Sequence, residues 1–305
     1  MRTLVRRLGP FVVGLVFFLG TACTAETATS PPSRHRTIRV AAFGFTESQI
    51  LAELYSQALR TRGFPTAVVQ AGPRELVQPA LAESLIDLVP EYAGSALSFL
   101  TLGATTGNAD VEETHEALSH VVARSGLVAL EPAPAQDANA IVVTDTTADR
   151  FGLGDISDLR GVAEQLIFGG PPECAHRHLC LRGLDSVYGL RFGEFVPLDT
   201  GGPLTVQALR SGGIDVALLF TTDPAIVSEG FVVLNDDREL QPSEHVTPLI
   251  RRQVLAIHGD GVVHTLNAVS AHLTTAALRS MIDEVAEGRA VPAVAASWLR
   301  DHGLA

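Results

Sequence analysis

The stretch ALAESLIDLVPEY, residues Ala80–Tyr92, decides the fold because a related stretch recurs later in the chain. It lines up without a gap against ALRSGGIDVALLF, residues Ala208–Phe220, and both copies begin with Ala-Leu and carry Ile-Asp before an aliphatic residue. Each copy is typical of a helix end, a turn and a strand. The offset of 128 residues predicts two lobes of similar design instead of tandem short repeats.

Aromatic residues end both copies of the repeat. Tyr92 is followed by AGS and Phe220 by TTD, and each stands at the carboxyl end of a predicted strand. Two aromatic side chains that face one cleft from opposite lobes would form a ligand clamp. The repeat alone leaves open the alternative that each side chain fills the core of its own lobe.

The residues before the first copy predict a β-α-β unit. TIRVAAF (37–43) and TAVVQ (66–70) read as strands, and the helical period of 3.6 runs through residues 46–63 between them. Such a unit makes a parallel sheet the default. Thr46 and Gln49 predict a capping box at the helix N-terminus. Helix N-termini at the carboxyl ends of strands commonly bind ligands in α/β proteins.

Composition bounds the class of protein. The chain has 305 residues, 46% of them apolar, which is enough for two α/β domains. Its formal net charge is −12 and it contains no lysine. An acidic surface argues against nucleic acid as a partner, and the missing lysine excludes P-loop and Schiff-base chemistry. The common catalytic motifs G-x-S-x-G, H-E-x-x-H and G-x-G-x-x-G are also missing from the sequence. We therefore predict that the protein is not an enzyme and has no catalytic residue and no cofactor.

The N-terminus predicts export. Residues 1–22 combine arginines, an apolar stretch and small residues, as a signal peptide does, and the next residue is Cys23. This layout resembles a bacterial lipoprotein signal, which implies that Cys23 is lipidated and anchors the chain to the outer face of the cell membrane. Gly20 stands where that pattern prefers leucine, so ordinary cleavage after Ala22 stays open. Residues 23–36 are rich in Ser, Thr and Pro and predict a flexible tether.

The segment ECAHRHLC admits two interpretations. It places four potential zinc ligands at every second position, namely Cys174, His176, His178 and Cys180. An exported protein lies in an oxidising compartment, however, where Cys174 and Cys180 can close a small disulfide loop. With Cys23 committed to lipid, the three cysteines then balance. We predict the disulfide and no metal, and keep a secreted zinc enzyme as a remote alternative.

Several motifs together resemble the solute-binding proteins of ABC importers for quaternary-ammonium osmoprotectants, the ProX-like binders of glycine betaine, choline and carnitine. The resemblance runs from Thr37 to Ala305 and is carried by FTESQILAELYSQAL (45–59), IDLVPEYAGSAL (86–97), GGIDVALLFTTDPAI (212–226) and FVVLNDD (231–237).

The resemblance implies the type II periplasmic-binding-protein fold, in which two α/β lobes joined by two crossovers close on a solute like a hinge. Lobe I is expected over residues 37–136 plus 247–305 and lobe II over residues 137–246. The implied function is an extracytoplasmic receptor that delivers a small quaternary-ammonium solute to a permease and its ATPase. A monomer is expected, with a lipid anchor as its only membrane contact.

The resemblance also implies a binding site. Betaine binders surround the trimethylammonium group with tyrosines, because aromatic faces attract a cation that has no N–H to donate. By alignment this cage falls on Tyr92, Asn139, Phe220 and Glu244, and the carboxylate clamp on Phe43, Ser95 and Arg177. The complete set of expected ligand-binding residues is Phe43, Thr46, Tyr92, Ser95, Asn139, Arg177, Phe220, Thr221, Asp223 and Glu244.

Half of the aromatic cage is replaced, which weakens the case for betaine itself. The alternative is a receptor of the same fold for an uncharged, aromatic or polyhydroxylated solute. Glu244 has two interpretations as well: a direct partner of a cationic solute, or an exposed loop carboxylate.

Overall fold

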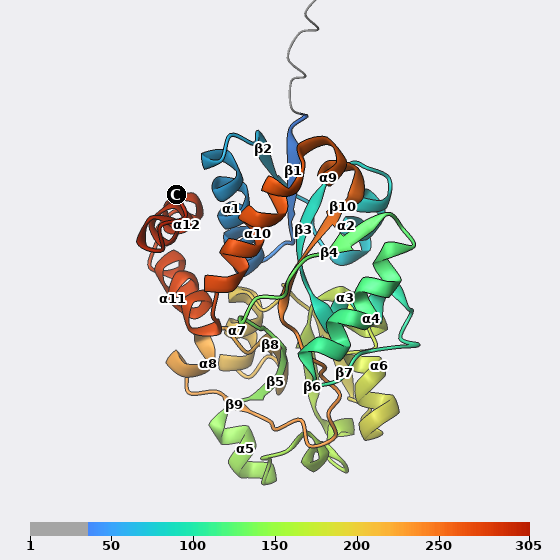
Figure 1. The fold of residues 1–305 in the computed structure, drawn as a ribbon. Helices are drawn as coiled ribbons and strands as arrows, with labels where there is room; N and C mark the ends of the chain where they lie inside the picture. Colours follow the sequence, from blue (N-terminus) through green and yellow to red (C-terminus); the bar gives the residue numbers. More distant parts are fainter. Residues whose placement is uncertain (1–35) are drawn as a thin grey trace, which may run out of the picture. The chain divides into compact units, whose positions relative to one another are not determined.

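The structure, a computed structural model, describes residues 36–305 and contains two five-stranded β-sheets with helices around them (Figure 1). The predicted fold class, two α/β lobes, is confirmed. The predicted signal peptide, Cys23 and the predicted tether up to residue 35 lie outside the described residues. Within residues 36–305, no helix is both long enough and apolar enough to cross a membrane.

The first sheet has the strand order β2-β1-β3-β10-β4. Its strands are β1 (Ile38–Ala42), β2 (Thr66–Gln70), β3 (Leu88–Tyr92), β4 (Leu127–Ala129) and β10 (Val246–Arg251). β1 pairs in parallel with β2 and β3, as the β-α-β pattern predicted, whereas β10 runs antiparallel to β3 and β4. The sheet is mixed because the chain enters β10 at the edge where β3 ends: Val246 pairs with Tyr92.

The second sheet has the strand order β7-β6-β8-β5-β9. Its strands are β5 (Asn139–Val143), β6 (Ile167–Gly170), β7 (Glu194–Pro197), β8 (Val216–Phe220) and β9 (Val232–Val233). β6 pairs in parallel with β7 and β8, and β5 runs antiparallel to β8 and β9. The strand that enters from the other sheet is therefore antiparallel in both sheets.

Helices connect and cover these strands. The α-helices are α1 (Thr46–Thr61), α2 (Arg74–Ala82), α3 (Ala93–Leu100), α4 (Val111–Ala123), α5 (Asp145–Phe151), α6 (Leu181–Gly183), α7 (Pro203–Arg210), α8 (Ala225–Ser228), α9 (Arg252–His258), α10 (Asp260–His272), α11 (Thr275–Ala286) and α12 (Val291–Asp301). Short 3₁₀ or π turns are η1 (Ile156–Leu159), η2 (Ala163–Gln165), η3 (Pro172–His176) and η4 (Leu184–Tyr188).

The internal repeat covers more of the chain than the sequence comparison showed. β1, β2, α2 and β3 correspond to β6, β7, α7 and β8 at the same offset, to within one residue at every boundary. Hydrogen bonds repeat too: the N–H of Arg39 donates to the Asp87 carboxylate at 3.0 Å, and the N–H of Ile167 donates to the Asp215 carboxylate at 2.9 Å. The two sheets are thus built on one plan.

α1 is the central helix of the first core. Its buried side chains Ile50, Leu54 and Ala58 recur four residues apart, with Leu51 and Leu59 beside them, as expected of a helix with one face in a core. α1 contacts α10, α11 and α12, and Figure 1 shows these C-terminal helices, in orange and red, beside it. The last helices therefore pack with the first sheet although they follow the second sheet in the sequence.

The N-terminus of α1 is held differently from the prediction. The N-cap residue is Phe45, and no side chain caps the helix, so the capping box of Thr46 and Gln49 is wrong. Instead the hydroxyl oxygen of Ser48, inside the helix, accepts the N–H of Phe43 at 2.8 Å. This bond fixes the turn that leads from β1 into the helix.

Two antiparallel segments link the sheets. Gln136 and His245 form an isolated β-bridge, and the N–H of Asp137 donates to the carbonyl of Glu244 at 3.1 Å. The predicted lobe boundaries run through these two segments.

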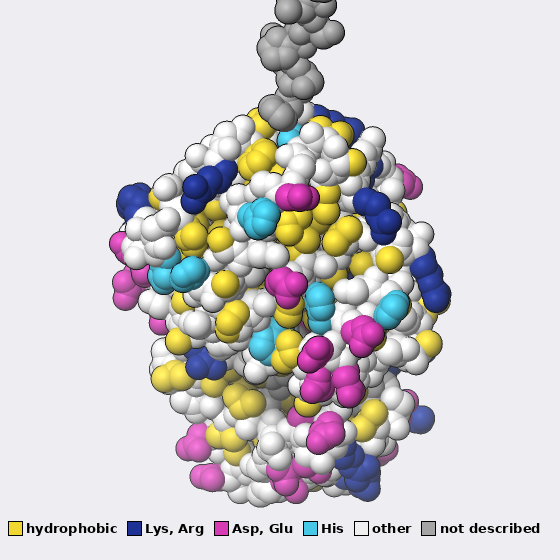
Figure 2. All heavy atoms as spheres, viewed as in Figure 1, with side chains coloured by type: hydrophobic (Ala, Val, Ile, Leu, Met, Phe, Trp, Pro, Cys, Tyr) yellow, Lys and Arg dark blue, Asp and Glu magenta, His cyan; other side chains and the backbone are white. Residues whose placement is uncertain are grey.

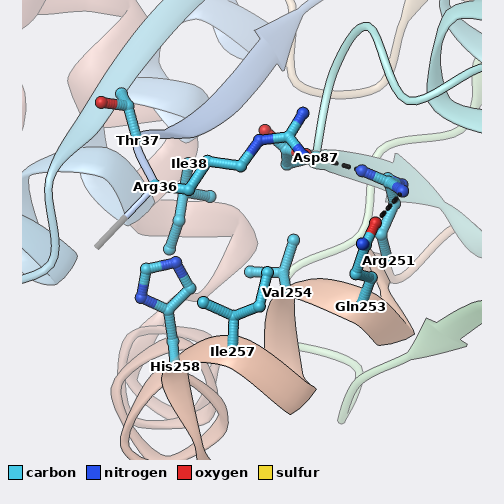
Figure 3. A pocket seen from close by; sticks show the side chains of 9 residues that line it. All are labelled: Arg36, Thr37, Ile38, Asp87, Arg251, Gln253, Val254, Ile257 and His258. Carbon is cyan, nitrogen blue, oxygen red and sulfur yellow. Dashed lines mark hydrogen bonds and ion pairs between the residues drawn. The ribbon is translucent and has the colours of Figure 1, made fainter. Parts of the chain in front are cut away.

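Ion pairs lie at the edge of the first sheet where β1 and β3 begin. Asp87 accepts from Arg251 at 3.0 Å (Figure 3) and from Arg39 at 2.7 Å. Burial alone would raise the pKa of Asp87, but the hydrogen bonds and charge of these arginines hold that pKa below its usual value. The hollow beside β1 and α9 measures about 10 Å³, enough for about one water. A solute site must lie elsewhere.

Candidate ligand-binding site

A cavity of about 320 Å³ lies where the parallel strands of both sheets end. The first sheet contributes residues that follow β1, β2 and β3, the second contributes residues at or after the ends of β6, β7 and β8, and the segment entering β5 completes the lining. The carboxyl edge of the strands is the usual ligand site of open α/β sheets. The volume suits a small molecule.

Aromatic side chains form one wall of this cavity. The ring centroid of Phe45 lies 6.1 Å from that of Phe43, 6.1 Å from that of Tyr92 and 5.3 Å from that of Phe220. Phe45 and Tyr92 follow or end strands of the first sheet, whereas Phe220 ends β8 in the second, so the wall joins both lobes. We call Phe43, Phe45, Tyr92 and Phe220 the aromatic wall. Such a wall buries methyl groups and attracts a cation.

Two buried carboxyl groups lie beside the aromatic wall. Glu47 accepts hydrogen bonds from the hydroxyl of Tyr92 at 2.6 Å and from the hydroxyl of Thr222 at 2.6 Å. Asp137, which lines the cavity, accepts from the N–H of Thr222 at 3.0 Å and from the hydroxyl of Thr221 at 3.1 Å. Among residues 36–305 no arginine or histidine forms an ion pair with either carboxyl group.

Burial raises the pKa of both carboxyl groups. The pKa of Glu47 rises to about 7, although the hydrogen bonds from Thr222 and Tyr92 work in the opposite direction. The pKa of Asp137 rises well above its usual value, because of burial first and the neighbouring Glu47 second. A nearby cation favours the ionised form of a carboxyl group. A cation bound in the cavity should therefore lower the pKa of both carboxyl groups and favour release of their protons.

Both arginines that line the cavity already form ion pairs. Arg74 donates to Glu91 through Nε at 3.0 Å and through Nη2 at 2.9 Å, and both side chains are buried. Arg177, after η3, donates to Glu75 of α2 at 3.2 and 2.9 Å. The second pair links the two lobes.

The environment of Arg74 is strongly acidic. Burial by itself would lower the pKa of its guanidinium group, but the carboxylates of Glu91, Glu244 and Glu75 raise the pKa above its usual value. The guanidinium also lies 5.2 Å from the ring centroid of Phe43. Arg74 thus connects the aromatic wall to a group of carboxylates.

A disulfide between Cys174 and Cys180 holds the loop that carries Arg177, so the predicted pairing is confirmed. The N–H of Arg177 donates to the carbonyl of Cys174 at 3.3 Å, and its own carbonyl accepts the N–H of Cys180 at 3.2 Å. Oxidised cysteines are not available as zinc ligands. Among the described residues no group of three or more His, Cys, Asp or Glu side chains could hold a metal ion. Nothing in the site supports the zinc-enzyme alternative.

One of the two predicted interpretations of Glu244, an exposed loop carboxylate, is wrong. Glu244 is buried, with 1% of its surface exposed, and it does not line the cavity. Its carboxylate accepts the hydroxyl of Ser95 at 2.7 Å and the N–H of Ser95 at 3.0 Å. Ser95 lies in the first turn of α3, where a carboxylate satisfies free N–H groups. Burial raises the pKa of Glu244 to about 7.

The cavity contains part of the predicted ligand set. Residues of that set that line it are Phe43, Tyr92, Ser95, Asn139, Arg177 and Phe220. Those outside its lining are Thr46, Thr221, Asp223 and Glu244. The amide of Asn139 donates to the Leu179 carbonyl and to Gln241, both at 3.0 Å.

Sequence reasoning missed four residues of the site: Phe45, Glu47, Arg74 and Asp137. The alternation in F-G-F, residues 43–45, was a usable signal for Phe45, because it puts two rings on one side of an extended turn. Asp137 lies within the predicted crossover, which also was a signal. Nothing in the sequence distinguished Glu47 from an ordinary acidic residue in the first turn of a helix.

Known proteins are similar to this chain in sequence. The family described as the substrate binding domain of ABC-type glycine betaine transport systems (OpuAC) matches residues 36–301. A glycine-betaine-binding protein of Pseudomonas aeruginosa is 28% identical over 285 residues, which cover 88% of each chain. The glycine betaine-binding protein YehZ of Escherichia coli is 25% identical over 269 residues, covering 85% of this chain and 88% of its own.

Solved structures show the same two-lobed fold. The crystal structure of a glycine betaine/carnitine/choline ABC transporter protein superposes with a TM-score of 0.67 at 22% identity, covering 88% of this chain and 99% of that one. Lactococcal OpuAC in its closed-liganded conformation with glycine betaine gives a TM-score of 0.62 at 14% identity, covering 88% and 96%. The fold is therefore that of the type II binding proteins. The chain belongs to the family of substrate-binding domains of ABC-type glycine betaine transport systems, which are transport components and not enzymes.

Proposed function

We propose that the cavity binds a small solute with a quaternary ammonium group, which the protein delivers to a permease and its ATPase. The observation that carries the proposal is the aromatic wall around Phe45, next to the carboxyl group of Asp137. A trimethylammonium group has no N–H to donate, so it is held by aromatic faces and by a negative charge. The cavity supplies both.

Contacts across the lobes support hinge closure as the delivery mechanism. Glu75 of α2 pairs with Arg177, and Glu47 of α1 accepts the hydroxyl of Thr222 at 2.6 Å. Both contacts join residues of the first lobe to residues of the second, so they break when the lobes separate. The two crossover segments near residues 136 and 245 are the natural hinge.

The location, membrane anchor and oligomeric state of the protein are proposed from the sequence. We propose that the protein acts outside the cytoplasm, is held there by a lipid on Cys23, and works as a monomer without nucleic acid. On the face drawn in Figure 2 the arginine side chains are separated, with acidic side chains among them, instead of forming one basic patch. This distribution supports the expectation that no nucleic acid binds.

The position of Phe45 favours a quaternary ammonium solute over an uncharged one. The alternative solute rested on the loss of two aromatic cage faces at Asn139 and Glu244. Phe45 supplies a face that the alignment did not include, and it touches the rings of both Tyr92 and Phe220. Binding of an aromatic or polyhydroxylated solute is one of the outcomes that the following test distinguishes.

Isothermal titration calorimetry on the purified protein tests the proposal. The titrants are choline, glycine betaine and carnitine, with a panel of sugars and phenolic compounds as the comparison. We expect saturable 1:1 binding of at least one quaternary ammonium compound and none of the comparison compounds. Binding of a sugar or a phenol, with no quaternary ammonium compound bound, would replace the proposal by the alternative.

A further inference from the structure

We propose that the cavity selects quaternary ammonium solutes with a net positive charge, of which choline is a simple example, over zwitterions such as glycine betaine. This inference rests on the proposed function and narrows its solute class. It follows from which charged groups around the cavity have a charged partner among residues 36–305 and which have none there.

The groups that would bind a solute carboxylate are occupied. Arg74 is 7% exposed and donates from two nitrogen atoms to Glu91, which is fully buried. Arg177 pairs with Glu75 at 2.9 Å and with Glu173 at 3.5 Å. A carboxylate entering the cavity would compete with these acidic partners for the guanidinium groups, and it would add a further negative charge among them.

Within the described part of the chain, in contrast, the groups that would bind a cation lack a charged partner. The hydrogen bonds that Asp137 and Glu47 accept from residues 36–305 come from neutral donors: the hydroxyls of Tyr92, Thr221 and Thr222 and the N–H of Thr222. Removing an ionised carboxylate from water is costly unless an opposite charge compensates it. A cation against the aromatic wall supplies that compensation next to Asp137.

Acidic groups outnumber basic ones around the cavity. Arg74 and Arg177 face the carboxyl groups of Glu75, Glu91, Glu173 and Glu244, and Glu47 and Asp137 come in addition. One further arginine approaches this region: Arg279 of α11 donates to the carbonyl of Thr221 at 2.9 Å. Arg279 is exposed, so solvent screens its charge. The balance stays negative with Arg279 included.

The uncharged end of a choline-like solute needs only neutral partners. Ser95 and Thr200 line the cavity and carry hydroxyl groups. The Ser95 hydroxyl donates to Glu244, which leaves its oxygen able to accept a hydrogen bond. An alcohol can therefore be accommodated by neutral partners alone, whereas a carboxylate would compete with Glu75, Glu91 and Glu173 for the two arginines.

Calorimetry with three matched ligands tests this inference: choline, glycine betaine and 3,3-dimethylbutan-1-ol, the uncharged carbon analogue of choline. We expect choline to bind at least about tenfold more tightly than glycine betaine. The carbon analogue should bind at least about tenfold more weakly than choline, because it has the shape but not the charge. Tighter binding of glycine betaine than of choline would overturn the inference and leave the proposed function standing. If neither compound binds, nor carnitine, the proposed function itself fails.

The variant Asp137→Asn tests whether Asp137 is the residue that makes the cavity prefer choline to glycine betaine. It should reduce the affinity for choline at least about tenfold and that for glycine betaine much less, so that the ratio between the two falls. Asp145→Asn is the matched control: it removes the same charge from an exposed position in the first turn of α5 and should leave the ratio unchanged. If Asp137→Asn does not fold, Glu47→Gln is the second variant, with the same expected direction. An unchanged ratio in a folded variant would overturn the assignment.

Discussion

Replacing Glu47 by glutamine should make the protein more stable above neutral pH, the opposite of what usually follows when a buried hydrogen-bonded residue is changed. The pKa of Glu47 rises from 4.5 to about 7 in the folded protein, mainly because burial disfavours the charged form. The folded state therefore binds the proton more tightly than the unfolded state, and the free energy of unfolding falls as the pH rises from about 4.5 to about 7. At 1.36 kcal/mol per pKa unit the loss amounts to about 3 kcal/mol.

Urea unfolding at a series of pH values from 4.5 to 8.5 measures this effect in the absence of solute. Glu47→Gln mimics the protonated side chain, so the variant and the parent should have similar stability near pH 4.5, and the variant should be more stable by about 3 kcal/mol at pH 8. Asp137 and Glu244 also have raised pKa values and remain in both proteins, so the difference between the two curves isolates Glu47 and its coupling to Asp137. Glu112→Gln, at an exposed position in α4, should run parallel to the parent. Parallel curves for Glu47→Gln and the parent would refute the reasoning.

Three further changes give measurable outcomes. Phe45→Ala should weaken binding of a quaternary ammonium solute at least about tenfold in calorimetry, because it removes the ring at the centre of the aromatic wall; unchanged affinity would exclude that ring from the site. The double change Cys174→Ser with Cys180→Ser opens a small loop and should cost about 2 kcal/mol in urea unfolding. Two free thiols in the denatured, unreduced parent protein lacking Cys23 would show instead that no bridge forms. Tyr92→Phe keeps the ring but removes the hydroxyl that donates to Glu47, and that hydrogen bond lowers the pKa of Glu47. Without it the pKa of Glu47 should rise, so cation binding should require a higher pH while the fold stays intact. A curve of affinity against pH identical to that of the parent would contradict this role.

Much of the fold was readable because the chain repeats itself. The 128-residue offset found in two short stretches runs through three strands and a helix in each sheet, and the alternation of strands and helices predicted the parallel pairs. Tyr92 and Phe220, singled out because they end the two copies, meet the same cavity from both lobes. The alternatives of clamp and core filler turn out not to be exclusive for Tyr92, which is 5% exposed and belongs to the first core while it lines the cavity.

The remainder of the site depended on side-chain directions that sequence spacing does not determine. Thr46 and Gln49 have the spacing of a capping box, yet the turn is held by Ser48 from inside the helix. Glu244 lies in QPSEHVTP, residues 241–248, whose polar residues and two prolines suggest an exposed loop. The crossover instead buries Glu244 against the N-terminus of α3.

The ion pairs around the cavity also could not be predicted from the sequence. Arg177 was assigned to a solute carboxylate by resemblance, and the structure shows it paired with Glu75 and Glu173. Glu75 lies about a hundred residues earlier in the chain, so the packing of one lobe against the other brings the two together. Long-range pairs of this kind decide what a cavity can bind.

A crystal structure of the protein grown with saturating choline examines the binding site itself. We expect density for the trimethylammonium group within about 6 Å of the ring centroids of Phe45, Tyr92 and Phe220, with Asp137 as the nearest charged group. Choline bound outside this cavity, or a cavity without choline in a crystal whose protein binds it in solution, would contradict the assignment of the site.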